Sequence, residues 1–211
     1  MKRTWLTAIL ALILSAAVRG ADLPDQVVAV GRAVGIDVQC GGLLVVGFSD
    51  ESPARDSGLR TGDLIELVDG KPVTEPEELR EMIQDKSQVV LTAARGSRRQ
   101  SFLVPLPDTG GVRELGASVK TRMAGIGTVT YYDPATEAFG ALGHGIADEV
   151  TGALFPLKRG YLCKASVVGA DRGRSGAPGM LQGAFDSARQ LGEVTANTPC
   201  GIFGRMTAAP E

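Results

Sequence analysis

Short apolar runs separated by glycines and polar turns dominate the hydrophobic pattern of this chain after residue 25. The clearest run, residues 41–47, reads G-G-L-L-V-V-G, and an apolar run between glycines is typical of a buried strand. Other segments with strand character are residues 36–38, 64–68, 89–94, 101–104, 115–119, 127–132, 138–142, 163–168 and 202–206. Because many short strands joined by glycine turns are typical of barrels and sandwiches, the pattern predicts a mainly β fold with a few short helices.

Two segments between the predicted strands favour a helix. Residues 54–59 suit one short helical turn, which Gly58 would end. A longer helix is predicted to begin at Thr74, because Thr74 and Glu77 have capping-box spacing and Pro76 is tolerated in a first turn. The apolar stripe of this second helix consists of Leu79, Met82 and Ile83.

The first twenty residues have the composition of an export signal. Lys2 and Arg3 precede an apolar run over residues 5–18, and small residues surround Gly20. The run is shorter than the roughly 20 residues of a permanent membrane span. We therefore expect residues 1–20 to be a signal peptide or an N-terminal anchor, and the remaining chain to be exported beyond the cytoplasmic membrane.

The charge balance and the small number of metal-ligating residues argue against nucleic-acid binding and against a metal site. The 22 Lys and Arg residues nearly balance the 24 Asp and Glu residues, so the protein has no broad positive field for nucleic acid. One histidine and three widely spaced cysteines do not predict a metal site, and no cofactor is expected. Cys40, Cys163 and Cys200 are either one disulfide and a free thiol or three small buried hydrophobic residues.

Residues 52–73 carry the most specific motif in the first half of the chain. They read S-P-A-R-D-S-G-L-R-T-G-D-L-I-E-L-V-D-G-K-P-V, in which Asp69 and Gly70 suit a tight hairpin turn. This motif and the order of the predicted elements resemble a PDZ domain, which would span residues 25–107.

The PDZ resemblance implies a peptide-binding function. In such domains an extended peptide adds as a strand beside the second strand and packs against the long helix. The resemblance places the loop that receives the peptide carboxylate at residues 33–36, so we expect Val34, Gly35 and Ile36 to bind peptide. The prolines and glycines of residues 105–111 then form the linker to a second domain over residues 112–211.

The single histidine, His144, is the main candidate for chemistry in the second half. It stands in F-G-A-L-G-H-G-I-A-D, residues 139–148, where flanking glycines leave the imidazole uncrowded. Histidine is the usual general base for activating a serine hydroxyl near neutral pH. A structural or surface histidine is the alternative interpretation.

Four stretches of the chain closely resemble the stage IV sporulation protein B (SpoIVB) family of serine peptidases. They are A-G-I-G-T-V-T-Y-Y-D-P (124–134), F-G-A-L-G-H-G-I-A-D (139–148), R-G-R-S-G-A-P-G (172–179) and G-E-V-T-A-N-T-P-C-G-I-F-G (192–204). The family also has an N-terminal export segment and a PDZ domain. The resemblance implies a trypsin-like β-barrel peptidase that cleaves itself and a partner protein in sporulation signalling, between the two membranes around the forespore.

Within this resemblance, His144 matches the catalytic histidine and would be the general base. Asp148 matches the motif G-H-x-I-x-D, and we expect its carboxylate to order the loop rather than to orient the imidazole. The nucleophilic serine of the family follows in a G-T-S-G-S-P-type motif that residues 1–211 do not contain. We therefore expect a chain truncated before the catalytic serine and inactive by itself, because triad members act as a unit.

Two alternatives remain open at this point. Ser175, in Gly173-Arg174-Ser175-Gly176, imitates a G-x-S-G motif and is the weaker candidate nucleophile. The other function is a non-catalytic, exported PDZ adaptor that binds protein segments, including a segment of its own chain. Against an adaptor, half of a double barrel would expose strand edges and apolar surface.

Overall fold

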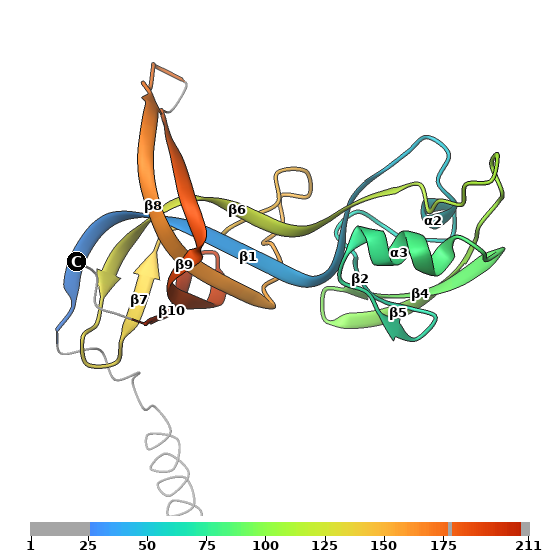
Figure 1. Cartoon of the computed structure of the whole chain (residues 1–211), viewed down its shortest axis with the longest axis horizontal. Helices are drawn as coiled ribbons and strands as arrows, with labels where there is room; N and C mark the ends of the chain where they lie inside the picture. Colours follow the sequence, from blue (N-terminus) through green and yellow to red (C-terminus); the bar gives the residue numbers. More distant parts are fainter. Residues whose placement is uncertain (1–25, 177–178, 208–211) are drawn as a thin grey trace, which may run out of the picture.

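The computed structural model describes residues 26–176 and 179–207, so the predicted export segment at residues 1–20 lies outside the described residues. The fold is mainly β, as predicted, and all ten strands belong to one antiparallel sheet. Figure 1 shows that this sheet forms two lobes, connected by the long strands β1 (Val28–Phe48) and β6 (Ala117–Tyr132). In the described part of the chain, no helix has the length and apolar character needed to cross a membrane.

The first lobe, which we call the PDZ-like lobe, spans residues 40–119 and has the sheet order β5-β4-β2-β1-β6. Its further elements are α2 (Pro53–Asp56), β2 (Leu64–Val68), β3 (Lys71–Pro72), α3 (Pro76–Ile83), β4 (Gln88–Arg95) and β5 (Arg98–Pro105). One hydrophobic core holds the lobe together, and its fully buried members include Leu43, Ile65 and Leu91. The predicted strands and helices of this lobe are all present, with shifted ends.

Local sequence explains where these elements begin and turn. The hairpin between β2 and β3 places Asp69 at φ 50° and Gly70 at φ 78°, the left-handed geometry that this residue pair favours. Helix α3 begins two residues later than predicted, because its N-cap is Glu75 and its capping box pairs Glu75 with Glu78, rather than Thr74 with Glu77. The carboxylate of Glu78 accepts hydrogen bonds from the backbone N–H groups of Thr74 (2.8 Å) and Glu75 (3.2 Å).

The second lobe, the barrel lobe, is a closed ring of six strands in the order β1-β6-β7-β10-β9-β8, with β8 pairing back to β1. Its further strands are β7 (Ala138–Ala141), β8 (Arg159–Asp171), β9 (Met180–Thr198) and β10 (Gly201–Met206). Phe139, Phe155 and Ile202 fill the interior. Because the ring closes, the strand segments within it have no open edge, in contrast to what was expected of half a double barrel.

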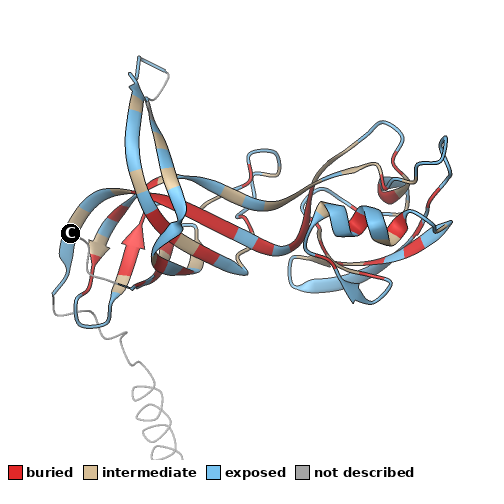
Figure 2. Ribbon diagram, in the orientation of Figure 1, coloured by how far each residue is buried: buried red, intermediate tan, exposed pale blue. Residues whose placement is uncertain are grey.

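The first half of β1 belongs to the barrel lobe, which corrects two predictions. Residues 28–39 pair with β6, and residues 34–39 also pair with β8. The predicted carboxylate-binding loop with Val34, Gly35 and Ile36 is therefore the interior of a strand, and the PDZ boundary at residue 25 is wrong. Val34 and Ile36 are 2% and 4% exposed, and Figure 2 shows this buried stretch of β1 in red. A backbone bonded on both sides has no N–H groups left for a peptide carboxylate.

Strand β1 passes from one lobe to the other through an irregularity between Gln39 and Leu44. Gly41 adopts a φ of 71°, and the Cys40 thiol donates a hydrogen bond to the carbonyl of Gly42 at 3.1 Å. Such a bulge bends a strand without ending it. The same strand can therefore serve two hydrophobic cores.

Strands β8 and β9 continue beyond the ring as a two-stranded arm. The arm is paired up to Asp171 and Met180, and Figures 1 and 2 show it projecting from the barrel with a largely exposed surface. Val167 and Val168 are 48% and 69% exposed on it. Most of β9 carries no apolar alternation, which explains why the sequence pattern predicted no strand there.

Candidate functional site

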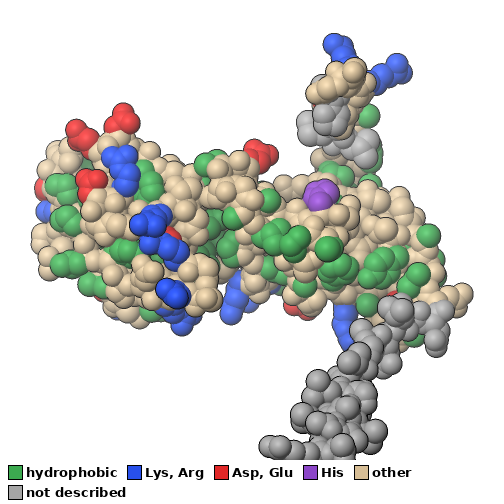
Figure 3. Space-filling view, turned by 180° about the vertical axis from the view of Figure 1, so that it is seen from behind, with side chains coloured by type: hydrophobic (Ala, Val, Ile, Leu, Met, Phe, Trp, Pro, Cys, Tyr) green, Lys and Arg blue, Asp and Glu red, His purple; other side chains and the backbone are tan. Residues whose placement is uncertain are grey.

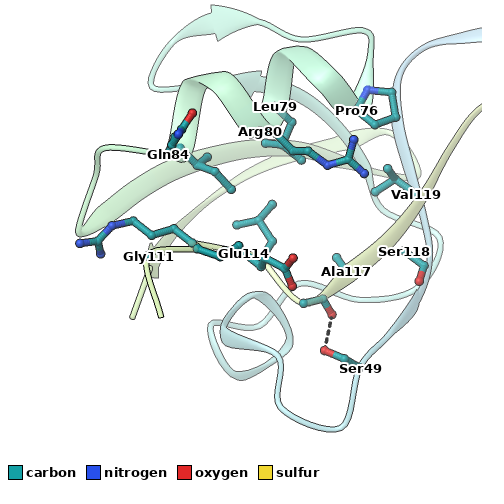
Figure 4. Close-up of a pocket in the computed structure, with 15 residues that line it drawn as sticks. Ser49, Pro76, Leu79, Arg80, Gln84, Gly111, Glu114, Ala117, Ser118 and Val119 are labelled. Atoms are coloured by element: carbon teal, nitrogen blue, oxygen red, sulfur yellow. Dashed lines mark hydrogen bonds between the residues drawn. The ribbon is translucent and has the colours of Figure 1, made fainter. Parts of the chain in front are cut away.

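A groove of about 490 Å³ lies in the PDZ-like lobe between α3 and residues 111–119, and we call it the α3 groove (Figure 4). Its apolar lining includes Leu79 and Ile83 from the helix and Leu115 and Val119 from the facing segment. Polar side chains also line it: Arg80, Gln84, Arg113 and Glu114. This combination fits an extended segment with apolar side chains.

The edge of β6 that faces α3 is open to an added strand. The carbonyl of Gly116 accepts hydrogen bonds from the backbone N–H of Ser49 at 3.0 Å and from its hydroxyl at 3.2 Å (Figure 4). Backbone groups of successive strand residues point to alternate sides, so the N–H and C=O of Ala117 point away from β1 and toward α3. In the described residues, the other strand neighbour of β6, β7, pairs only from Val129 onward.

The helix that lines this groove was predicted correctly, but the strand on its other side was not predicted to bind peptide. The peptide was predicted to bind at the loop of residues 33–36, whereas the structure places the groove beside the start of β6. The signal for the correct position is Glu114-Leu115-Gly116-Ala117, an apolar residue and a glycine before an extended segment. Gly116 adopts a φ of 64°, a conformation that glycine accepts readily.

His144 lies on a loop that follows β7 in the barrel lobe. The chain turns through Leu142 and Gly143, at φ 73° and 84°, and the exposed imidazole follows. Figure 3 shows this single histidine on the barrel surface, below the arm. The imidazole Nδ1 lies 3.0 Å from the carbonyl oxygen of Gly145. Because a carbonyl only accepts hydrogen bonds, Nδ1 carries the proton in this contact, and Nε2 of the neutral ring keeps its lone pair.

Asn197, near the end of β9, braces this loop with three hydrogen bonds. Its Oδ1 accepts from the backbone N–H of Ile146 at 2.8 Å, and its Nδ2 donates to the carbonyls of Ile146 at 2.8 Å and Phe155 at 2.9 Å. The loop also lies tightly against β9, since a Cβ atom at Gly145 would be 2.5 Å from the carbonyl oxygen of Thr198. No role for Asn197 was predicted from the sequence, although this residue lies in one of the family-like stretches.

Replacing Asn197 with alanine should loosen the His144 loop. The change leaves the N–H of Ile146 and the carbonyl of Phe155 without their partner, whereas the carbonyl of Ile146 keeps its hydrogen bond from the N–H of Phe155 at 2.9 Å. The expected cost is about 1–3 kcal/mol in unfolding free energy. Backbone hydrogen exchange at Ile146 should accelerate accordingly. Asn197→Asp should not restore the brace, because it keeps the acceptor for the Ile146 N–H but sets a carboxylate oxygen against the carbonyls of Ile146 and Phe155. The control is Thr195→Ala, an exposed residue of the same strand. Unchanged exchange at Ile146 would contradict the brace.

Asp148 orders the loop and does not contact the imidazole, as expected. It is 0% exposed, and its carboxylate accepts hydrogen bonds from Lys120 Nζ at 2.7 Å and from the N–H groups of Val150 at 3.1 Å and Thr151 at 2.9 Å. Burial raises the pKa of Asp148, but the hydrogen bonds from Lys120 and Thr151 outweigh it and hold the pKa below its usual value. The group is therefore a carboxylate at neutral pH.

The structure does not bring Ser175 to His144. Ser175 is exposed at the tip of the arm, between the end of β8 at Asp171 and the start of β9 at Met180. Over the described ranges, the imidazole makes its hydrogen bond to Gly145 and none to a serine hydroxyl.

The cysteines are free thiols, two of them buried (Cys40 and Cys163) and one exposed (Cys200). The described part of the chain contains no group of three or more His, Cys, Asp or Glu side chains arranged to hold a metal ion.

Comparisons with known proteins agree with this two-lobed arrangement. Residues 111–211 match the sequence model of the family described as SpoIVB peptidase S55, and residues 45–95 match that of the PDZ domain. A solved PDZ domain of an SdrC-like protein from Listeria monocytogenes is 26% identical, with a TM-score of 0.34, over 37% of this chain and 87% of that one. The comparison with curated proteins gave no match.

Proposed function

Because this chain belongs to the SpoIVB peptidase S55 family over residues 111–211 and carries a PDZ domain before it, we propose that it is a serine endopeptidase with His144 as its general base. The observation that carries this proposal is the geometry of the imidazole. His144 is exposed, its Nδ1 is bonded to the Gly145 carbonyl, and Nε2 is left to accept a proton.

In the proposed mechanism, Nε2 takes the proton of a serine hydroxyl as the serine oxygen attacks the scissile carbonyl. The same nitrogen then gives this proton to the leaving amine, and the acyl-enzyme is hydrolysed by water. Asn197 and Asp148 hold the loop that carries His144 in place. The resemblance implies that the nucleophile belongs to a G-T-S-G-S-P-type motif, which residues 1–211 do not contain.

The α3 groove would bind an extended protein segment as an added strand on β6. The N–H and C=O of Ala117 would pair with the segment, and Leu79, Ile83 and Val119 would take its apolar side chains. The segment belongs to the protein substrate or to the peptidase itself, in keeping with regulated self-cleavage and partner cleavage. The apolar run at residues 5–18 supports export, and sporulation signalling is the setting that the family suggests.

The proteolytic activity is tested with two purified proteins. One is the 211-residue chain, and the other is the same chain extended by the corresponding segment of a SpoIVB-family peptidase, which supplies a G-T-S-G-S-P-type motif. We expect casein cleavage, self-cleavage and labelling by a fluorophosphonate only in the longer protein, and unchanged activity in its Ser175→Ala variant. Cleavage by the 211-residue chain that disappears with Ser175→Ala would instead identify Ser175 as the nucleophile.

Peptide binding is tested by Val119→Asp, which places a charge in the apolar part of the groove. The probe is the tightest heptapeptide selected on the 211-residue chain from libraries that display both free carboxyl termini and internal segments. Loss of one buried valine contact is worth about 1.5–3 kcal/mol, so the dissociation constant should rise at least about tenfold in fluorescence anisotropy. Val90→Asp on β4, where the valine is 39% exposed, is the matched control and should bind normally.

One observation favours the adaptor as a second candidate function. The six-stranded ring closes within the described residues, and each lobe has its own buried hydrophobic core. Peptide binding with no cleavage by either protein in the activity test would establish the adaptor.

A further inference from the structure

The strand that lines the α3 groove continues directly to a residue that contacts the His144 loop. Val119 lines the groove, and the next residue of β6 is Lys120. The ammonium group of Lys120 lies 2.7 Å from Asp148 Oδ2, and residue 148 is four positions after His144. One ion pair thus joins the peptide-binding edge of the PDZ-like lobe to the catalytic loop of the barrel lobe.

Both sides of this contact are held firmly. Lys120 is paired with Leu44 of β1, and the sulfur of the buried Cys40 packs 3.6 Å and 3.4 Å from the carbonyl oxygens of Lys120 and Thr121. On the other side, Asp148 binds the N–H groups of Val150 and Thr151, and its own N–H donates to the carbonyl of Ala153 at 2.9 Å. A displacement of β6 at residue 120 must therefore act on this carboxylate.

Loss of the Lys120–Asp148 ion pair should cost more free energy than loss of an exposed ion pair. Asp148 is fully buried, whereas the Lys120 side chain is 37% exposed. Removing the lysine leaves a buried carboxylate with two backbone N–H donors but no counter-charge, which is far costlier than losing an exposed ion pair. The loop would respond by moving the carboxylate toward water, and this movement would carry residues 144–151 with it.

We propose that Lys120 is a positioning residue for His144, acting through Asp148. We further propose that a peptide bound along residues 117–119 changes the position and surroundings of the imidazole through the Lys120–Asp148 ion pair. The effect of the peptide rests on the proposed peptide-binding function of the α3 groove. The positioning role of Lys120 does not, because it concerns the free protein.

The single histidine of the chain makes a direct test possible. The 211-residue protein labelled with 15N-histidine has one imidazole, so its NMR signals need no assignment. Lys120→Met should shift or split these signals, and Lys120→Arg, which restores the cation, should return them toward the wild-type positions. Lys71→Met, at an exposed lysine of β3, is the matched control and should leave them unchanged. If Lys120→Met fails to fold, Lys120→Gln replaces it, since glutamine still donates a hydrogen bond but carries no charge.

The selected heptapeptide then tests the link to the groove. In the wild-type protein it should move the imidazole signals, and in Lys120→Met it should bind within twofold of the wild-type affinity without moving them. Identical imidazole spectra of wild type and Lys120→Met would overturn the positioning role. A peptide that binds but moves the signals equally in both, or in neither, would overturn the coupling alone. Failure of every peptide to bind would overturn the peptide-binding function and the coupling, while the lysine variants still decide the positioning role.

Discussion

Replacing His144 with glutamine in the active peptidase should lower kcat by roughly 10⁴-fold. Glutamine keeps a similar size and can still hydrogen-bond, but it cannot take the serine proton in the transition state. KM should change little, because in the proposed mechanism the imidazole transfers the serine proton and does not bind the substrate. Steady-state cleavage of a fluorogenic peptide, together with active-site titration, separates these two constants.

The fold should not respond to this substitution. His144 is exposed, and its imidazole bonds only to the carbonyl of the next residue within the described residues. Thermal unfolding of the His144→Gln protein should therefore match that of the wild type. A variant that retains more than about a tenth of the wild-type kcat would rule out general-base catalysis by His144.

Asp63→Ala should cost the PDZ-like lobe about 3 kcal/mol of unfolding free energy, because it removes the acceptor of a largely buried ion pair. Asp63 is 1% exposed, and its carboxylate binds Arg95 through Nε at 2.7 Å and Nη2 at 2.6 Å. It also accepts a hydrogen bond from the backbone N–H of Arg60 at 2.8 Å. The substitution leaves the backbone N–H of Arg60 and the Nε–H of Arg95 without their acceptor. The guanidinium, which lies over Phe102 at 5.5 Å from the ring centroid, then keeps only its hydrogen bond to the carbonyl of Gly58 at 2.9 Å.

Urea unfolding measures this loss as a lower midpoint at an unchanged slope. Asp63→Asn should recover part of the stability, since its amide oxygen can still accept from Arg60. Asp56→Ala is the control, because its side chain is 75% exposed and its ion pair with Arg55 is long, at 3.9 Å. Equal midpoints for Asp63→Ala and Asp56→Ala would show that the buried pair adds no stability.

Patterns of a few residues predicted the PDZ-like lobe well. Its turns need positive φ angles that Asp69-Gly70 and Gly96 supply, and its helix needs the cap that glutamate and proline provide. The loop with His144 was also found, because the only histidine stands between glycines. These features depend on interactions within about five residues, which a single sequence displays.

The features that the sequence analysis missed depend on contacts between distant segments. Residues 28–48 form one strand, but the glycines at 41 and 42 imitate a strand end, so its continuation across the bulge was not foreseen. The groove lies beside β6 because β6, rather than residues 36–38, faces α3, and only the tertiary arrangement shows this. Asn197 reaches a loop about 50 residues earlier in the chain, and no local pattern indicates such a partner.

Strands β1 and β6 run through both lobes, so the protein cannot be divided between the lobes without losing one of these strands. Their paired residues run from Val28 and Tyr132 at one end to Phe48 and Ala117 at the other. A cut at residue 107 would remove β6 and with it the strand of the α3 groove, and a start at residue 111 would remove β1 and open the ring. The PDZ match ends at residue 95 and the peptidase match begins at residue 111, but β1 and β6 each belong to both lobes, so neither half is a module that could be exchanged intact.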